Sequence, residues 1–569
     1  MEQASQVGTT SRGAMALAFF LPILLLLPFI NRAYNIDEPM FVWVAQHIVH
    51  HPLDYFGGSV ERSSGPEPMY MYNQNPPGFS YVLAIFGAIG GWSEPVLRIA
   101  SLLAAGLCSL GTYLVAARLT PRPLFAALLT ILTPGFFVSA NTVMTDVALT
   151  ASYVWAVYFW LRWLDGGKKS HLAISIAIIT AGTLMKYYAV TLVPLLVVYT
   201  LMKRKKPGAW IAGLGVPILA VVAFWLLSWQ LYGVNLLDVA AGVAQDPSVR
   251  QGDEPMYREI VTLLFVGGCF APMALCALFI LRPIGAVAWI GTVVAALAFK
   301  MDGYSLIQLM IGTSDRYGLG MLIHLGLMLA AGGLLIVLPV RDTVQHRDAE
   351  GVLLALWVFG AIVFTLYLNH LINARTLLPL APAMGIVIAR NLPATAGRAV
   401  QFTPVALGAV LSLWVAWGDY IVAEGGRHAA REAIARAKAE KVGLYYAGLW
   451  GFQYYVTQGG GKAFSVIDGG YGGEHKIKMT HGDLLVISSD SREKWRTPPD
   501  RFEEIAFPSV PNRARVATYH PVDPAGFYSH LSGILPYKFG QSSQEEYGIY
   551  RWLGPTYVAE PEASASATP

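Results

Sequence analysis

The chain has 569 residues, of which 55% are hydrophobic and only 13% are charged. Soluble domains carry roughly a quarter charged residues, so a mean hydropathy of +0.48 indicates that most of this chain lies in lipid. The net charge of +4 is too small and dispersed to indicate nucleic-acid binding, and the apolar content excludes disorder over most of the length. The three cysteines lie in apolar stretches and show no disulfide framework or metal-ligand spacing.

Apolar stretches long enough to cross a bilayer recur along the chain. The first covers about residues 14–30, and no small-residue cleavage pattern clearly follows it, so we expect an uncleaved first span. Further spans are expected at about residues 98–117, 124–141, 147–164, 171–185, 188–202, 209–230, 260–281, 284–299, 318–340, 351–368, 376–389 and 403–423. Residues 1–423 are therefore predicted to form an all-α polytopic membrane domain of about 13 transmembrane helices.

The distribution of charge between the spans predicts the orientation. With the N-terminus in the cytoplasm, the inner segments hold 15 basic and five acidic residues, whereas the outer segments hold nine basic and 15 acidic residues. Basic residues favour the cytoplasmic side, so we expect a cytoplasmic N-terminus. Because the number of spans is odd, the chain after residue 423 is expected outside.

The tail, residues 424–569, differs in kind from the apolar part. It carries 16 basic and 16 acidic residues, and its apolar runs are short. The pattern predicts a helix over Glu424–Lys441, a strand over Val442–Tyr446, a helix over Trp450–Gln458 and a strand over Leu484–Ser488. A small extracytoplasmic α/β domain fits this order of elements.

The outer loop between the first two spans, residues 31–97, is long for a connector, and long loops are often functional. It begins N-I-D-E-P-M-F-V-W, which places Asp37 and Glu38 at the expected membrane edge. Two surface helices are predicted, over Pro39–His50 and Pro77–Ile89. An acidic pair in this position can also serve simply as a helix start, where negative charge favours the helix dipole.

The order of landmarks along the chain resembles that of the C-superfamily of membrane glycosyltransferases. An acidic pair after the first span precedes an X-Pro-Pro helix and then Arg98 at the head of the next span. T-V-M-T-D-V contains Asp146, T-L-M-K-Y-Y contains Lys186, N-A-R-T-L-L-P contains Arg375, and W-G-F-Q-Y-Y begins at Trp450. More narrowly, these tracts resemble the protein mannosyltransferase and aminoarabinose transferase group, and the chain is similar to bacterial members of glycosyltransferase family 39. Each motif alone is weak, but their order and common side make the resemblance specific.

The resemblance implies transfer of a sugar from a polyprenyl phosphate, with inversion, to an acceptor on the outer face. It implies that Asp37 is the general base and that Glu38 orients it or binds the sugar. The departing phosphate gains negative charge, so cations should receive it, and the candidates are Lys186, Arg375 and Arg98. Asp146 is expected to hold substrate as a second acid.

Each of these residues also has a structural interpretation. Arg98, Arg375 and Lys186 can snorkel to headgroups at the ends of spans. Asp146 can begin the fourth span as a helix cap. Charges at the membrane edge are nevertheless costly, which favours a functional role.

Two positions concern the substrate directly. Tyr72 is either an interfacial aromatic or a substrate contact. Asn75 stands before Pro76-Pro77, where aminoarabinose transferases have Lys-Pro and protein mannosyltransferases have His-Pro-Pro. A neutral amide cannot supply phosphate-binding charge, so Asn75 is expected to contact substrate differently, and this departure weakens an assignment to aminoarabinose transfer. The tail lacks the β-trefoil module that eukaryotic members insert, which favours a bacterial enzyme of the inner membrane.

Two other classes of function are open: a transporter or lipid flippase, and a sensor or assembly protein that acts through its tail. No convincing internal repeat is found and the charged candidates share one membrane face, which argues against transport. The chain has no Walker-type phosphate loop, which disfavours ATP-driven pumping.

His47, His50, His51 and Asp54 are spaced too loosely to predict a metal site. We expect no cofactor beyond the lipid-linked sugar substrate, with a divalent metal left open, and an acceptor lipid, glycan or protein.

Overall fold

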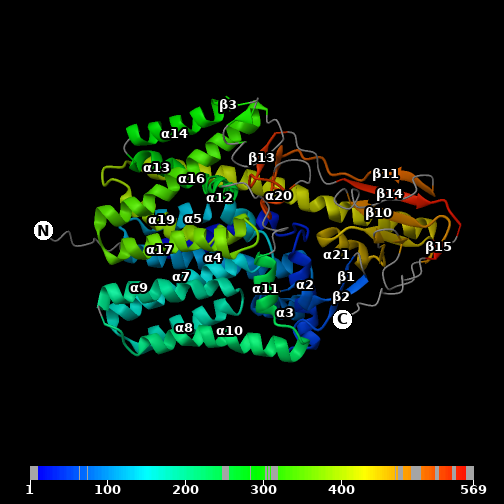
Figure 1. The fold of residues 1–569 in the computed structure, drawn as a ribbon, viewed down its shortest axis with the longest axis horizontal. Helices are drawn as coiled ribbons and strands as arrows, with labels where there is room; N and C mark the ends of the chain where they lie inside the picture. The colour runs from blue at the N-terminus through cyan, green and yellow to red at the C-terminus, as the bar shows by residue number, and fades with distance from the viewer. Residues whose placement is uncertain are drawn as a thin grey trace.

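The computed structural model describes residues 10–62, 65–73, 75–204, 206–245, 256–281, 283–301, 304–305, 308, 318–464, 466–467, 470–471, 478–488, 501–519, 525–540, 546–555 and 557–558. A body of packed helices occupies one end of the molecule, and a tail that contains a five-stranded sheet occupies the other (Figure 1). The predicted class, a mostly helical protein with a small strand-containing C-terminal region, is confirmed.

The helices of the described residues follow the predicted spans closely. In chain order they are α1 (Arg12–Leu26), η1 (Leu27–Phe29), α2 (Glu38–His50), η2 (Met69–Met71), α3 (Gly78–Gly90), α4 (Glu94–Leu119), α5 (Pro123–Ile131), α6 (Pro134–Ala140), α7 (Asp146–Gly166), α8 (Lys169–Thr183), η3 (Tyr187–Thr191), α9 (Leu192–Arg204), α10 (Trp210–Tyr232), α11 (Leu236–Gln245), α12 (Tyr257–Cys269), α13 (Ala271–Ile280), α14 (Pro283–Ala298), α16 (Leu319–His346), α17 (Ala349–Val363), η4 (Phe364–Leu368), α18 (Ala374–Leu377), α19 (Leu380–Asn391), α20 (Arg398–Glu440) and α21 (Trp450–Gln458). Each predicted span coincides with helical structure.

By length and composition, fewer helices qualify as membrane spans than the 13 predicted. Within the described residues six are long and apolar enough, and the number rises to eight if two bent pairs each count as one span. The pairs are α5–α6, bent by 67°, and α12–α13, bent by 90°. Pro134 and Pro272 lie in the first turn of the second helix of each pair, where the missing proline N–H prevents an uninterrupted helix. The count of about 13 stays a prediction.

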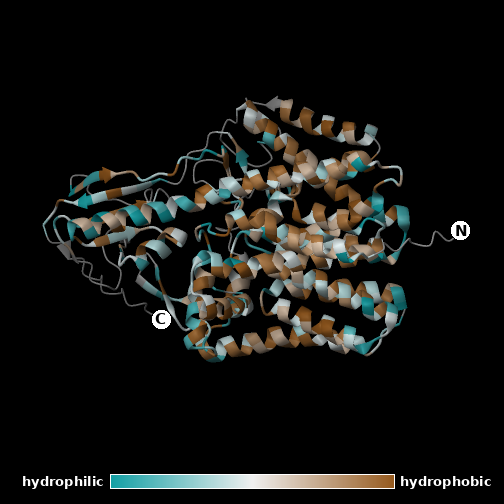
Figure 2. Ribbon diagram, turned by 180° about the vertical axis from the view of Figure 1, so that it is seen from behind, coloured by the Kyte–Doolittle hydropathy of each residue, from teal (hydrophilic) through white to brown (hydrophobic). Residues whose placement is uncertain are grey.

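The helical body carries apolar residues on its outside as well as inside. Brown, hydrophobic segments run along the helices of the body, whereas hydrophilic residues gather at helix ends and in the tail (Figure 2). Large side chains such as Leu219, Val287, Leu319 and Val410 are more than half exposed. An exposed apolar surface of this extent fits a lipid environment and identifies a multi-pass membrane protein.

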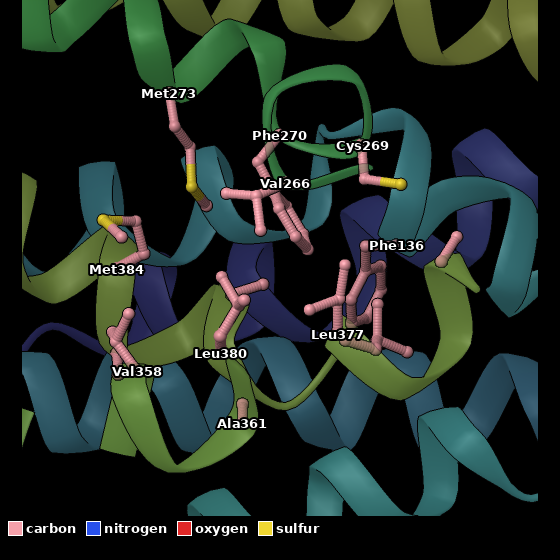
Figure 3. Packing of buried hydrophobic residues seen from close by; sticks show 14 of the residues in the cluster. Phe136, Val266, Cys269, Phe270, Met273, Val358, Ala361, Leu377, Leu380 and Met384 are labelled. Atoms are coloured by element: carbon pink, nitrogen blue, oxygen red, sulfur yellow. The ribbon is translucent and has the colours of Figure 1, made fainter. Parts of the chain in front are cut away.

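The interior of the body holds the short helix α18 in place. Leu377 on α18 and Leu380 on α19 are fully buried against Phe136 of α6 and Phe270 at the α12–α13 bend (Figure 3). These residues come from segments far apart in sequence, so tight packing between them restrains the position of α18. Arg375 lies on the same short helix, two residues before Leu377.

The first outer loop forms the two predicted surface helices. α2 begins one residue before the predicted Pro39, and α3 covers the predicted segment to within one residue at each end. Between them, β1 (Ser59–Arg62) and β2 (Gly65–Pro68) form an antiparallel hairpin. The loop lies where the helical body meets the tail, next to α11 and α21 (Figure 1).

The tail contains a mixed five-stranded sheet of order β11-β14-β10-β5-β6. β5 (Leu444–Ala447) pairs in parallel with β10 (Leu484–Ser488) and β6 (Lys462–Ala463), and β14 (Tyr547–Trp552) pairs antiparallel with β10 and β11 (Phe502–Ala506). The predicted helix over Trp450–Gln458 and strand over Leu484–Ser488 have the predicted bounds, and the first tail strand begins two residues late. The remaining strands are short pairs: β3 (Lys300–Met301) with β4 (Tyr304–Ser305), β7 (Val466–Ile467) with β8 (Gly470–Tyr471), β9 (Lys478–Met479) with β15 (Tyr557–Val558), and β12 (Val516–Ala517) with β13 (Lys538–Phe539).

One helix joins the two parts of the molecule. α20 has 43 residues and runs without interruption from the helical body to the sheet (Figure 1). Its last turns bury Ala429, Ala430 and Ala433 against the sheet and α21. The predicted domain boundary between residues 423 and 424 therefore falls inside a continuous helix, and the division into 1–423 and 424–569 stays a prediction.

Candidate active site

Asp37 lies immediately before α2, and its carboxylate is not used to cap the helix. A residue in this position commonly accepts hydrogen bonds from the first backbone N–H groups. Here the side chain turns instead to Arg375, whose Nη2 lies 2.9 Å from Asp37 Oδ2. The preceding residue, Ile36, has a φ of +51°, a strained conformation for a β-branched residue. Strain of this kind is found at positions where the surrounding structure fixes a functional side chain.

Arg375 comes from the opposite side of the site, on α18. The helix starts at the Asn373 cap, whose Oδ1 accepts a hydrogen bond from Thr376 N at 2.9 Å. The N-A-R-T tract thus fixes a single turn that directs the arginine toward the first outer loop. Its second nitrogen, Nη1, lies 2.6 Å from the Met144 sulfur. The Arg375 side chain is 11% exposed and that of Asp37 is 35% exposed, so the pair has one buried and one accessible partner.

Lys186 and Asp146 form a second ion pair. Lys186 Nζ lies 2.7 Å from Asp146 Oδ1, and the two side chains are 15% and 4% exposed. Asp146 is the first residue of α7, and Lys186 occupies the turn between α8 and η3. Asp146 is therefore the first helical residue and not the cap of α7, which is Thr145, and its carboxylate holds the lysine.

The two ion pairs line one cavity of about 540 Å³. This volume is within the range of roughly 300–1,000 Å³ typical of small-molecule sites. Asp37, Asp146, Lys186 and Arg375 thus converge from four segments that are distant in sequence. Apolar residues of α11 and η4 form another part of the wall, including Leu237, Ala240, Phe364 and Leu368. Charged groups that face an apolar wall suit a substrate with a phosphate and a hydrocarbon chain.

Tyr72 and Asn75 also line this cavity. Tyr72 is bound through its hydroxyl to the Glu67 carboxylate, and Asn75 is exposed at its position before the two prolines. Gly78, three residues after Asn75, donates its N–H to Leu184 O at 2.8 Å. A Cβ at position 78 would lie 2.6 Å from that oxygen. The Pro-Pro-Gly tract is therefore held against the turn that carries Lys186.

Glu38 and Arg98 do not line the cavity as the described residues define it. Both are fully buried, and Arg98 Nη2 lies 3.0 Å from Glu38 Oε1. Glu38 also accepts from the Arg32 guanidinium and from the backbone N–H groups of Asn35 and Val143. Its oxygens are thus fully used in holding the loop that carries Asp37. The substrate roles predicted for Glu38 and Arg98 gain no support from this geometry.

Several residues of the cavity wall were not predicted from the sequence, and His370 is one that can carry charge. His370 lies in the loop between η4 and α18. Burial lowers its pKa, and the charges of Lys186 and Arg375 act in the same direction while Asp37 opposes them. The imidazole is therefore uncharged at neutral pH. Its position just before the N-A-R-T tract was the available signal.

Trp450 is another cavity residue that sequence reasoning missed, because its tract was noted only for its resemblance. It opens α21 with a φ of +66° and brings the tail to the cavity wall. Gly451 packs so closely on the first outer loop that a Cβ would meet Tyr34 O at 2.0 Å. Tyr455 reinforces this contact, since its hydroxyl accepts from Tyr34 N at 2.8 Å and lies 2.5 Å from Glu94 Oε1.

The described residues contain no group of three or more histidine, cysteine, aspartate or glutamate side chains arranged to hold a metal ion. His47 and His51 stack at 4.8 Å between ring centroids, and His47 Nε2 lies 3.8 Å from Asp54 Oδ2. The loose cluster in the sequence is thus a set of local contacts.

Residues 74–229 match the family model of the dolichyl-phosphate-mannose-protein mannosyltransferases. The predicted resemblance is confirmed. The matched range contains Asn75, Arg98, Asp146 and Lys186, whereas Asp37 and Arg375 lie outside it. The mannosyltransferase-like segment therefore supplies one of the two cavity ion pairs, and the flanking sequence supplies the other. A search of curated proteins finds no match to the chain.

Three solved structures that match the chain are the following. ArnT from Cupriavidus metallidurans, bound to undecaprenyl phosphate, is 16% identical with a TM-score of 0.47, over 87% of this chain and 97% of that chain. An oligosaccharyltransferase from Archaeoglobus fulgidus, tethered with an acceptor peptide, is 13% identical with a TM-score of 0.43, over 80% and 64%. The arabinosyltransferase EmbB from Mycobacterium smegmatis is 15% identical with a TM-score of 0.27, over 71% and 37%.

Proposed function

We propose that this protein is an integral-membrane glycosyltransferase that moves a hexose or pentose from a polyprenyl phosphate to an acceptor on the extracytoplasmic face. The observation that carries the proposal is the convergence of two carboxylate–cation pairs, Asp37–Arg375 and Asp146–Lys186, at one cavity. The cavity has the cations that a lipid phosphate requires and an accessible carboxylate suited to a general base. The mannosyltransferase family match over residues 74–229 supports the same class of reaction.

In the proposed reaction Asp37 takes the proton of the acceptor hydroxyl. The oxygen of that hydroxyl forms a bond to the anomeric carbon of the sugar, and the bond from this carbon to the phosphate oxygen breaks. The configuration inverts because attack comes from the face opposite the leaving group. The polyprenyl phosphate leaves with one more negative charge, and Lys186 and Arg375 stabilise that charge. A single displacement of this kind needs no covalent enzyme intermediate.

The ion pairs suggest how the donor prepares the base. Without donor, Asp37 Oδ2 is paired with Arg375 Nη2 at 2.9 Å, so this oxygen is already occupied. A donor phosphate that binds Arg375 competes with Asp37 and leaves its oxygens available to the acceptor. Lys186 is shared in the same way between Asp146 and the phosphate. Ordered binding, donor before acceptor, follows from this competition.

The position in the cell is part of the same proposal. The charge asymmetry of the loops supports a cytoplasmic N-terminus. The first outer loop and the tail lie at the same end of the helical body (Figure 1). We therefore place the cavity and the tail on the outer face of a bacterial inner membrane, where the acceptor is a lipid, a glycan or a protein.

The test is a transfer assay with purified full-length protein and a panel of polyprenyl-phosphate sugars in lipid vesicles. The expected result is the loss of one donor and the release of an equal amount of polyprenyl phosphate in the presence of envelope acceptors. Release must depend on the acceptor. Movement of an intact donor across the vesicle membrane, without cleavage, would instead favour a flippase.

A further inference from the structure

The strand-poor part of the tail packs directly behind the segment that carries Arg375. Ala374 N donates a hydrogen bond to Phe527 O at 3.0 Å, and His530 N donates to Ile372 O at 2.9 Å. These bonds lie on both sides of the α18 start. Residues 525–540, which we call the brace, thus fix the backbone on which the arginine is mounted.

A histidine side chain of the brace completes this arrangement. Ile372 N donates to His530 Nδ1 at 3.1 Å, and the imidazole is only 2% exposed. A buried backbone N–H that loses its acceptor costs free energy comparable to that of a lost hydrogen bond. His530 therefore fixes residue 372, three positions before Arg375, in one conformation.

Tyr528 connects the brace to the other half of the site. The Arg375 guanidinium carbon lies 5.7 Å from the centre of the Tyr528 ring, which suits a cation–π contact. The Tyr528 hydroxyl accepts from Arg32 Nη2 at 3.0 Å and donates to Asp419 Oδ1 at 2.8 Å. Arg32 also pairs with Glu38, the residue after Asp37.

The contacts of Tyr528 and His530 therefore reach both members of the Asp37–Arg375 pair. One set of bonds holds α18, and the other holds the start of α2 through Arg32 and Glu38. Since all of these groups are buried, they have few alternative partners. A shift of about 1 Å in a reacting group can cost a factor of about 100 in rate.

We propose that Tyr528 and His530 are positioning residues of the active site, so that the tail sets the placement of Arg375 relative to Asp37. This inference rests on the proposed function and deepens it. The tail is then a working part of the enzyme rather than an appended module. Neither residue touches substrate, because each acts through the segment that it holds.

The experiment compares His530→Ala with His530→Asn in the full-length protein. Asparagine offers an oxygen near the place of Nδ1 and can still accept from Ile372 N, whereas alanine leaves that N–H without a partner. His481→Ala is the matched control, because His481 is an exposed tail histidine whose Nδ1 contacts Leu553 O at 3.0 Å. Tyr528→Phe keeps the ring over Arg375 and removes only the hydroxyl contacts.

Three quantities are measured: kcat, the Kd for undecaprenyl phosphate and the apparent unfolding temperature. For His530→Ala we expect kcat to fall by about 10- to 100-fold and Kd to rise several-fold. His530→Asn should recover most of both losses, and Tyr528→Phe should lower kcat more than it changes Kd. The control should match the wild type. These comparisons are made per folded molecule, so a loss of folded protein alone does not mimic them.

Equal kcat and Kd in wild type and His530→Ala, or no recovery with asparagine, would overturn the positioning role. The Kd readout also separates this inference from the proposed function. If the wild type transfers no sugar from any donor, the proposed function fails, and the effect of the brace on Arg375 is decided by Kd alone. If the wild type is active and substitutions in the brace change neither kcat nor Kd, only the present inference fails.

Discussion

Asp37 is the residue on which the proposed chemistry depends most. Its substitution by asparagine distinguishes a role as general base from a role in donor binding. Asp37→Asn should lower kcat by a factor of about 100 or more, because an amide cannot take the acceptor proton. The same change removes the carboxylate that competes for Arg375. The Kd for undecaprenyl phosphate, measured on the purified variant, should therefore stay equal or decrease.

Asp54→Asn is the matched control, because Asp54 is a half-exposed aspartate of the same outer loop. It should retain wild-type turnover. If Asp37→Asn turned over at the wild-type rate, the base would have to be another group. If turnover were lost together with donor binding, Asp37 would serve the binding site instead.

Lys186 and Arg375 carry the predicted phosphate contacts. Lys186→Ala and Arg375→Ala should each raise the Kd for undecaprenyl phosphate by about tenfold, as expected for loss of one charge-assisted hydrogen bond of about 1.5 kcal/mol. Lys186→Ala also leaves Asp146 buried without its cation. The double variant Lys186→Ala/Asp146→Asn removes that penalty, so it shows how much of the loss is due to the phosphate.

Restoration of wild-type Kd in this double variant would mean that Lys186 only neutralises Asp146. An unchanged Kd in both single variants would contradict the phosphate role altogether. Vesicle binding with a neutral polyprenol in place of the phosphate is the control for the contribution of the hydrocarbon chain, which these substitutions should not alter.

At the scale of single residues, the sequence singled out four charged residues that the structure brings to one cavity, and their catalytic roles stay predictions. Asp37, Asp146, Lys186 and Arg375 were singled out because they stand in tracts that resemble a glycosyltransferase family, and the cost of a charge at a membrane edge supported the choice. The partners of these charges could not be read, since pairing depends on how distant segments pack. Asp419 shows that not every such charge was recognised. It lies inside a predicted span but was not singled out, and the structure pairs its carboxylate with Arg32 at 2.7 Å.

At the scale of elements, the close contact between α21 and the first outer loop is a sharp target. In Gly451→Ala the added Cβ would lie 2.0 Å from Tyr34 O, so the helix must move and take Trp450 away from the cavity wall. We expect an increase in KM for the acceptor of about tenfold or more and a lower apparent unfolding temperature. Steady-state kinetics with varied acceptor measures the first effect.

Gly291→Ala is the control for this variant, because a Cβ at Gly291 on α14 meets nothing within 4 Å. Alanine also favours a helix over glycine, so this control should not be destabilised. Wild-type KM in Gly451→Ala would show that the contact between α21 and the loop does not shape the cavity.

Elements were predicted more accurately than their breaks. Hydrophobic runs and X-Pro starts gave α2, α3 and α21 nearly to the residue, because local sequence decides where such helices begin. The segments of α5–α6 and α12–α13 were each predicted as one span, without the bend that the structure shows. Proline marks each bend, but the angle of the second helix depends on tertiary packing that a hydropathy window does not contain.

At the scale of the whole molecule, the junction of tail and helical body should be sensitive to acid through His530. Burial lowers its pKa to about 4, and the nearby charge of Arg258 and the imidazole of His370 act in the same direction. The ring of Tyr257 packs at 6.1 Å between centroids, and Ile372 N donates to Nδ1. The folded protein therefore holds this imidazole neutral, and protonation would remove the acceptor that residue 372 uses.

The sign of the pH effect follows from the two protonation states. Between about pH 6.5 and pH 4 the unfolded chain binds a proton at His530 that the folded chain excludes. The full contribution to the free energy of unfolding is thus present above pH 6.5 and is lost as the pH falls to 4, with an upper limit of about 3.5 kcal/mol at 1.4 kcal/mol per pKa unit. Because asparagine does not titrate, His530→Asn should show a shallower fall in apparent unfolding temperature over this range. Parallel curves for the two proteins would mean that the brace stays docked when His530 is protonated, and that acid acts on the molecule through other groups.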